Sequence, residues 1–126
     1  MTISLTAAPA TRPDGDVAPA PIDLVHLARQ CLGDRALETE LLGLFERQAH
    51  AIIDSLSQTP ARIDLKARAD LAHTLKGSAL AVGARRVADA AQAYENAAAR
   101  NTDAQIAALQ IAVDEARRAV ASLLAA

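Results

Sequence analysis

Aromatic residues are scarce in this chain: Phe45 and Tyr94 are the only two among 126 residues, and tryptophan is absent. Hydrophobic residues nevertheless make up 52% of the sequence, so leucine, alanine, isoleucine and valine must form the interior. Such an interior favours closely packed helices over a sheet. Two aromatic side chains are also too few to form a stacking platform for nucleic acid. We therefore expect an all-α protein.

A second cysteine and a strong charge imbalance are also lacking. Cys31 stands alone, which excludes an internal disulfide and suits a reducing compartment. The formal net charge of −2 gives no overall basic field, so we expect no nucleic-acid partner. No uninterrupted apolar run approaches the length of a membrane span, and the N-terminus lacks the apolar core of a signal peptide. These absences predict a soluble, cytoplasmic protein with no membrane partner.

Metal-ligand spacing is missing too. His26 and His50 fall in different predicted helices, and no Cys, Asp or Glu stands near them at a convincing ligand spacing. A histidine at a helix boundary or on a half-buried face explains each of them, so we predict no metal site.

What is present is a tail followed by helices. Residues 1–21 contain every proline except Pro60 and show no helical period, so we predict a disordered tail. One domain is expected over 22–126. Its short loops and long amphipathic segments predict an antiparallel up-down four-helix bundle, with a short first helix covering one end. The first expected helix has about ten residues, is capped by Asp23 and ends near Gly33. The second runs from Asp34 to about Ser57, and the third from about Arg62 to Val82 with Gly83 as a left-handed terminator. The fourth runs from about Ala84 to Ala99, and the fifth starts at Asn101 and Thr102, with Thr102 and Gln105 at capping-box spacing.

The most informative stretch is HTLKGSALAVGARRV, residues 73–87, in the third of these helices. His73, Lys76 and Gly77 share one face at helical spacing. His73 falls about 160° from Leu75, which belongs to the core stripe, so we expect the imidazole to be exposed. A neutral imidazole carries a basic nitrogen that can attack phosphorus near neutral pH, and a lysine one turn away can offset phosphoryl charge. The expected core stripe consists of Leu71, Ala72, Leu75, Ala79 and Val82.

This stretch resembles the phosphorylation motif of the histidine-containing phosphotransfer (HPt) domains of two-component phosphorelays. The motif fixes a histidine, a lysine and two glycines at set offsets, together with small and apolar positions between them. The matching residues are His73, Leu75, Lys76, Gly77, Ser78, Ala79, Gly83 and Ala84, followed by apolar Val87.

The resemblance implies that the distal ring nitrogen of His73 is phosphorylated. It also implies that the inner nitrogen donates to a side chain 22 residues later, which here is Glu95. Glu95 as an ordinary exposed helix acid is the open alternative. Gly77 leaves room for an incoming active site, and Leu80 with Ala69 offers an apolar docking surface. The residues expected to face a partner are Lys66, Ala69, Asp70, Gly77, Leu80, Arg85 and Arg86.

The partners that the resemblance implies are a histidine kinase or hybrid kinase and the receiver domain of a response regulator, which supplies the acceptor aspartate and bound magnesium. The chain itself is expected to be a monomer that binds no cofactor. Since it lacks a glycine-rich nucleotide loop, we expect a phosphoryl carrier and not an autonomous kinase. Two alternatives remain open: a dimeric kinase core, which would normally carry an acid where Thr74 follows His73, and a helical adaptor that moves no phosphate.

Overall fold

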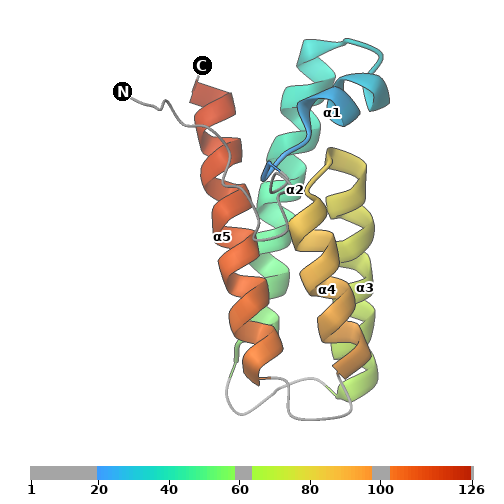
Figure 1. Cartoon of the computed structure of the whole chain (residues 1–126), viewed down its shortest axis with the longest axis vertical. Helices are drawn as coiled ribbons and strands as arrows, with labels where there is room; N and C mark the ends of the chain where they lie inside the picture. Colours follow the sequence, from blue (N-terminus) through green and yellow to red (C-terminus); the bar gives the residue numbers. More distant parts are fainter. Residues whose placement is uncertain (1–19, 59–63, 98–102, 126) are drawn as a thin grey trace, which may run out of the picture.

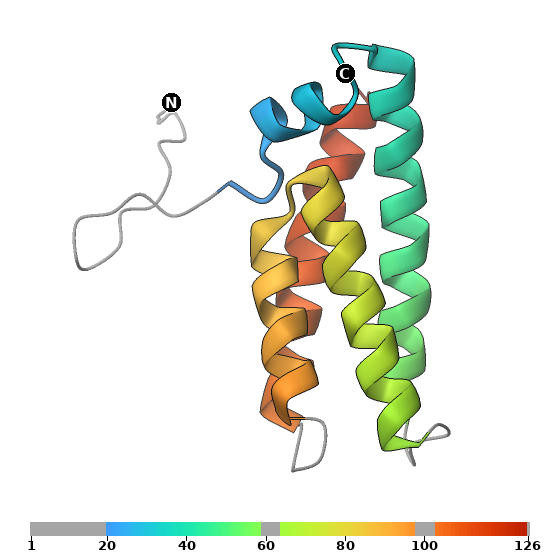
Figure 2. The same ribbon diagram turned by 90° about the vertical axis from the view of Figure 1, so that its right-hand side faces the viewer.

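The computed structural model describes residues 20–58, 64–97 and 103–125, and within these ranges every regular element is a helix. The long helices lie side by side, and the short first helix lies across their upper end (Figures 1 and 2). Most of the expected tail, the turn at Pro60 and the capping residue Thr102 lie outside the described residues. The helices are α1 (Leu24–Gln30), α2 (Arg35–Leu56), α3 (Leu65–Val82), α4 (Arg85–Ala97) and α5 (Asp103–Ala125).

The long helices form an antiparallel up-down bundle in which each packs against two others. The contacting pairs are α2 with α3, α3 with α4, α4 with α5, and α5 with α2. The short helix α1 packs on α2 and α3 at the upper end of the bundle (Figure 2). This confirms the all-α bundle with a covering helix that the composition and loop lengths predict.

Aspartates begin three of the helices. The side chains of Asp23, Asp34 and Asp64 each accept a hydrogen bond from a backbone N–H three residues later, at 3.0, 3.1 and 2.8 Å. Such a cap satisfies one of the backbone donors that a helix N-terminus leaves unpaired. The caps at Asp23 and Asp34 were predicted, whereas α3 begins at Leu65 behind Asp64 and not near Arg62.

The first helix is shorter than expected. It ends at Gln30, because Leu32 and Gly33 both have positive φ, at 52° and 78°, and turn the chain out of the helix. The Gly33 N–H donates to the Ala28 carbonyl at 3.0 Å, which closes the turn.

The turn between α3 and α4 has the left-handed glycine that the sequence predicts, since Gly83 has a φ of 79°. This glycine has a second role that the sequence did not indicate. The Asp23 N–H donates to the Gly83 carbonyl at 2.9 Å. A Cβ atom on Gly83 would lie 2.9 Å from both the Cβ and the carbonyl oxygen of Asp23. Gly83 therefore permits the close contact that holds the start of α1 against the α3–α4 turn.

The core is aliphatic apart from the two aromatic residues and Cys31. Tyr94 is fully buried and Phe45 is 2% exposed, as their expected packing role requires. The Tyr94 hydroxyl accepts a hydrogen bond from Arg68 Nε at 2.8 Å, so its polar atom is satisfied. From the predicted stripe of α3, Ala72, Leu75, Ala79 and Val82 are buried and Leu71 is partly buried.

The described residues show neither a membrane-spanning helix nor a cluster of metal ligands. None of the described helices combines the length and apolarity that crossing a lipid bilayer requires. Across the same residues, no three His, Cys, Asp or Glu side chains gather as a metal site would need.

Candidate functional site

His73 lies on the outer surface of α3, and its side chain is 70% exposed. Its neighbours Ala72 and Leu75 are fully buried, so the helix is anchored from behind by the core. The separation of about 100° per helical residue places the imidazole away from these core positions. A ring in this position is accessible to another protein.

Glu95 approaches the histidine from α4. His73 Nδ1 and Glu95 Oε1 are 3.3 Å apart, at the long end of hydrogen-bonding distance. The glutamate side chain is 29% exposed, so it is more enclosed than the histidine it contacts. When Nδ1 carries the ring proton and donates it to this carboxylate, Nε2 keeps a lone pair and remains the nucleophilic nitrogen.

Lys76 is held by a residue that the sequence reading missed. Its Nζ donates to Gln92 Oε1 on α4 at 2.5 Å. The Gln92 amide in turn donates to Asn96 Oδ1 at 2.8 Å. Gln92 stands one helical turn before Glu95, so this spacing was the available signal. Side chains of α4 therefore contact both the histidine and the lysine of α3.

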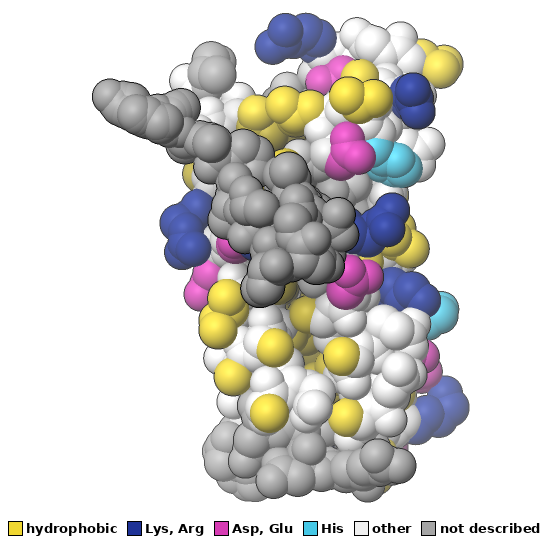
Figure 3. All heavy atoms as spheres, viewed as in Figure 1, with side chains coloured by type: hydrophobic (Ala, Val, Ile, Leu, Met, Phe, Trp, Pro, Cys, Tyr) yellow, Lys and Arg dark blue, Asp and Glu magenta, His cyan; other side chains and the backbone are white. Residues whose placement is uncertain are grey.

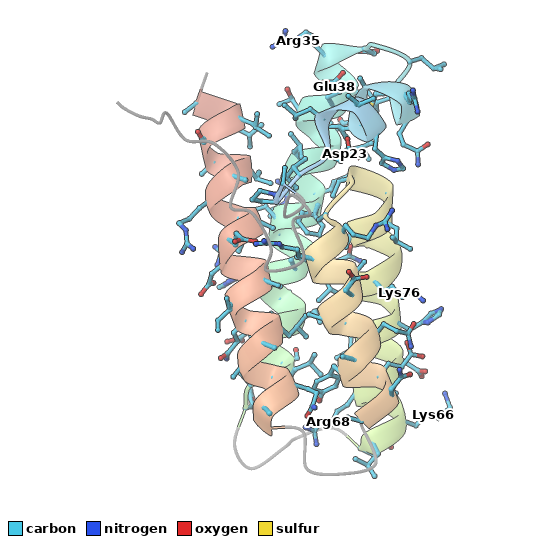
Figure 4. The ribbon with its side chains drawn as sticks, in the orientation of Figure 1. Asp23, Arg35, Glu38, Lys66, Arg68 and Lys76 are labelled. Atoms are coloured by element: carbon cyan, nitrogen blue, oxygen red, sulfur yellow. The ribbon has the colours of Figure 1, made fainter. Side chains whose placement is uncertain are left out.

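Lys66 and Asp70 form an exposed ion pair on α3, with 2.8 Å between Nζ and Oδ2. The hydrogen bond and the charge of Asp70 raise the pKa of Lys66. Lys66 and Lys76 lie on the same side of the molecule (Figure 4). In the space-filling view, histidine and basic side chains line the edge that α3 forms (Figure 3).

The surface beside His73 is open and partly apolar. A Cβ atom on Gly77 would meet no atom within 4 Å. Leu80 is 41% exposed one turn further along α3, and Ala69 is half-buried. Ser78 donates a hydrogen bond to Gln48 of α2, so the side chains bordering this surface come from α2 as well as α3 and α4.

The two arginines after α3 differ in their surroundings. Arg85 is exposed. Arg86 Nη1 lies 2.7 Å from both oxygens of Glu115 on α5, so its charge already has a partner inside the bundle. The sequence did not indicate this contact, because Glu115 is distant along the chain.

Comparison with known families and structures agrees with this geometry. The chain belongs to the Hpt domain family, which it matches over residues 40–123. Its fold is similar to the crystal structure of the histidine-containing phosphotransfer protein ZmHP2 from maize, with a TM-score of 0.66 and 26% identity over 82% of this chain and 89% of the maize chain.

A rice protein described as a histidine-containing phosphotransfer protein shares the fold at a TM-score of 0.54 and 23% identity, over 82% of this chain and 74% of the rice chain. No curated protein sequence matches the chain.

Proposed function

We propose that this chain carries a phosphoryl group on His73 between a histidine kinase or hybrid kinase and the receiver domain of a response regulator. The observation that carries the proposal is the exposed His73 ring, 70% accessible, with Nδ1 beside Glu95 on the next helix. Membership of the Hpt domain family supports the same function.

The transfer exchanges one bond to phosphorus for another. The Nε2 lone pair of His73 attacks the phosphorus of a receiver's aspartyl phosphate, an N–P bond forms, and the P–O bond to the aspartate breaks. The released carboxylate keeps the electron pair. In the onward step an aspartate of the next receiver attacks and Nε2 leaves. Glu95 keeps the proton of the ring on Nδ1 throughout.

Lys76 has an electrostatic role in this proposal. Its ammonium group lies one turn from His73 and would offset charge on the phosphoryl oxygens. The hydrogen bond to Gln92, at 2.5 Å, limits the positions that the ammonium can take. The catalytic groups otherwise come from the receiver, which supplies the aspartate and magnesium, so this chain needs no cofactor.

The docking surface in this proposal surrounds His73. Leu80 and Ala69 supply apolar contact, Gly77 leaves space above the ring, and the remaining residues supply charge. Arg86 would contribute its charge to a partner only by leaving its ion pair with Glu115. The proposed contact residues are Lys66, Ala69, Asp70, Gly77, Leu80, Arg85 and Arg86. A four-helix bundle completed within one chain supports a monomer, and such a carrier would act in the cytoplasm beside its kinase and receivers.

The experiment incubates the protein with a panel of receiver domains that carry radiolabelled aspartyl phosphate. We expect acid-labile label on the wild type and none on His73→Gln. His50→Gln is the matched control, because His50 is also exposed but lies on α2. Label that persists on His73→Gln would refute the assignment of the histidine. Receiver binding without any transfer to the wild type would instead identify an adaptor.

A further inference from the structure

The chain has two lysines, and both lie on α3 (Figure 4). Lys66 is paired with the carboxylate of Asp70, with 2.8 Å between Nζ and Oδ2. Lys76 has a neutral acceptor instead, since its Nζ donates to the amide oxygen of Gln92 at 2.5 Å. Within the part of the chain that the structure describes, Lys76 forms no ion pair. Its hydrogen bond therefore holds the ammonium group without cancelling the charge.

The Gln92 side chain can accept from this lysine in one orientation only. An ammonium group has three donors and no acceptor, so the amide atom that faces it must be Oε1. The other end of the amide, Nε2, then donates to Asn96 Oδ1 at 2.8 Å. Gln92 and Asn96 stand one turn apart on α4, where two amide side chains are within reach of each other. Asn96 thus stabilises the orientation in which Gln92 accepts from Lys76.

The contact lies beside the proposed phosphorylation site. His73 Nδ1 is 3.3 Å from Glu95 Oε1. Lys76 follows His73 by one turn of α3, and Gln92 precedes Glu95 by one turn of α4, so the second contact repeats the first at the next level of this antiparallel pair. Lys76 and Gln92 are half-buried, whereas His73 is exposed. A phosphoryl group on His73 would therefore lie in water near an ammonium group that α4 holds.

From the neutral acceptor, its single orientation and its place one turn from His73, we infer that Gln92 is a positioning residue for phosphoryl transfer. It acts through Lys76, because it restricts the ammonium group and leaves the full charge for the phosphoryl oxygens. A glutamate in its place would bind the lysine more tightly and cancel that charge. The inference rests on the proposed function, since it assigns a role within the same site.

Gln92→Glu separates this electrostatic role from a structural one. If Gln92 only joined α4 to α3, a glutamate would serve as well, because it keeps an acceptor at this place. We expect Gln92→Glu to unfold at no lower urea concentration than the wild type. We also expect it to accept a phosphoryl group about fivefold more slowly, the loss that one interaction between partly exposed charges explains.

The first assay uses phosphoramidate, a small anionic donor that requires no receiver. The Nε2 lone pair of His73 attacks its phosphorus and an N–P bond to the ring forms. The bond from phosphorus to the leaving nitrogen breaks, and ammonia departs with the electron pair. Phosphorus NMR of the full chain follows the reaction, and the signal that His73→Gln lacks identifies the site. This assay tests Gln92 whether or not a receiver transfers to the chain.

The second assay measures single-turnover transfer from a phosphorylated receiver at increasing receiver concentration. Gln92→Glu should lower the rate at saturation about fivefold and leave the half-saturating concentration unchanged, because the substitution alters charge at the phosphoryl group and not the docking residues.

A third comparison tests whether Gln92 acts through the lysine. Gln92→Met removes the acceptor and keeps the length of the side chain, so it frees the ammonium group without cancelling its charge. It should slow both reactions about threefold in the wild-type background. In Lys76→Gln it should have no further effect, since the residue that it releases is gone.

Gln110→Glu is the matched control. Gln110 is also half-buried and bonds to a side-chain oxygen, Ser57 Oγ, at 2.8 Å. It lies on α5, and among the described residues α5 makes no contact with α3. This variant should react like the wild type in both assays.

Four outcomes would overturn the inference. They are equal rates in Gln92→Glu and the wild type, slower reaction accompanied by lower stability, slower transfer from the receiver with unchanged phosphoramidate labelling, and an effect of Gln92→Met that persists in Lys76→Gln. If phosphoramidate gives the expected differences and no receiver labels the chain, the relay is contradicted and the role of Gln92 is supported.

Discussion

Two glycines inside long helices have different surroundings, and the difference separates the site from the scaffold. Gly77 stands one helical turn beyond His73, where a Cβ atom would meet nothing within 4 Å. Gly43 lies on α2, where a Cβ atom would come within 3.3 Å of an Arg47 guanidinium nitrogen. Packing does not require glycine at position 77. We attribute Gly77 to the space that an incoming receiver needs beside the imidazole.

Gly77→Ala should therefore stabilise the protein and impair its function. Replacing a mid-helix glycine with alanine raises the free energy of unfolding by about 1 kcal/mol. The added methyl group should slow transfer from a phosphorylated receiver by about tenfold, since misplacement of the reacting groups is costly. Urea denaturation and single-turnover transfer measure the two effects. Gly43→Ala is the control, with similar stabilisation and unchanged transfer. Unchanged transfer in both variants would remove the proposed role of Gly77.

Glu95 gives the second prediction at this scale. Glu95→Ala removes the acceptor 3.3 Å from His73 Nδ1. We expect transfer to slow by about tenfold, because a hydrogen bond to a charged group contributes about 1.5 kcal/mol. Glu95→Gln keeps a carbonyl oxygen at this place and should restore most of the rate. Nitrogen chemical shifts of the His73 ring report its tautomer and should change in Glu95→Ala only. An unaltered tautomer in Glu95→Ala would contradict the positioning role.

The sequence was informative about single residues where helical spacing alone decides, since it predicted an exposed His73 and a buried Leu75. Glu95 on the neighbouring helix was an expectation from the resemblance to HPt domains. The sequence did not predict that Gln92 anchors Lys76, or that Glu115 pairs with Arg86. Those contacts join helices whose rotation and level are set by packing, which the spacing within one helix does not reveal.

At the scale of elements, the α3–α4 turn and the start of α1 form one unit. Gly33 and Gly83 both have positive φ, at 78° and 79°. A Cβ atom on Gly33 would meet nothing within 4 Å, whereas one on Gly83 would lie 2.9 Å from Asp23. The same substitution therefore tests backbone strain at one glycine, and strain plus a collision at the other.

Gly33→Ala should lower the free energy of unfolding by about 1–2 kcal/mol, the cost of a left-handed alanine. Gly83→Ala should lower it by about 3 kcal/mol, because Asp23 must also move. Hydrogen exchange should show faster exchange of the α1 amides in Gly83→Ala. If both variants lose the same free energy of unfolding, and the α1 amides exchange slowly in both, then the contact with Asp23 does not contribute to stability.

Helix ends were predictable where a capping residue stands near the end of an apolar period. Asp23, Asp34 and Gly83 were identified in this way. The end of α1 was placed too late, because nothing in the pattern indicates that Leu32 adopts a φ of 52°. The start of α3 was placed too early, since residues before Asp64 could continue the apolar period without the cap.

At the scale of the whole molecule, the buried thiol of Cys31 links stability to pH. Cys31 is 1% exposed. Burial, with the nearby carboxylates of Glu38 and Asp34, raises the pKa of this thiol. Between the ordinary thiol pKa and the raised value, the unfolded chain loses a proton that the folded chain keeps. The free energy of unfolding therefore falls as pH rises through that window, and the contribution is constant below it.

The comparison of wild type with Cys31→Ala isolates this effect. The raised pKa of Lys66 is common to both proteins and cancels in the difference. Urea denaturation over a pH series should show a wild-type advantage that shrinks once the pH passes the ordinary thiol range. A constant difference across the alkaline series would show that Cys31 keeps its ordinary pKa in the folded state.

The fold as a whole was the most predictable property. An interior with two aromatics, short loops and caps before apolar helical periods all favour one bundle, so independent signals agree. The ion pair between Arg117 of α5 and Glu46 of α2 was not predictable. It depends on the rotation and level of one helix relative to the other, which result from the whole packing.

The burial of Tyr94 has a practical consequence for experiments. The chain has no tryptophan, so its single tyrosine is the main ultraviolet fluorophore. The phenol of Tyr94 is buried and accepts a hydrogen bond from Arg68. Its emission should report the loss of the native interior without any attached dye. When the protein is mixed with a tryptophan-containing receiver, red-shifted emission comes from the receiver alone. Encounter of the two molecules and unfolding of this one can then be followed at separate wavelengths in the same cuvette.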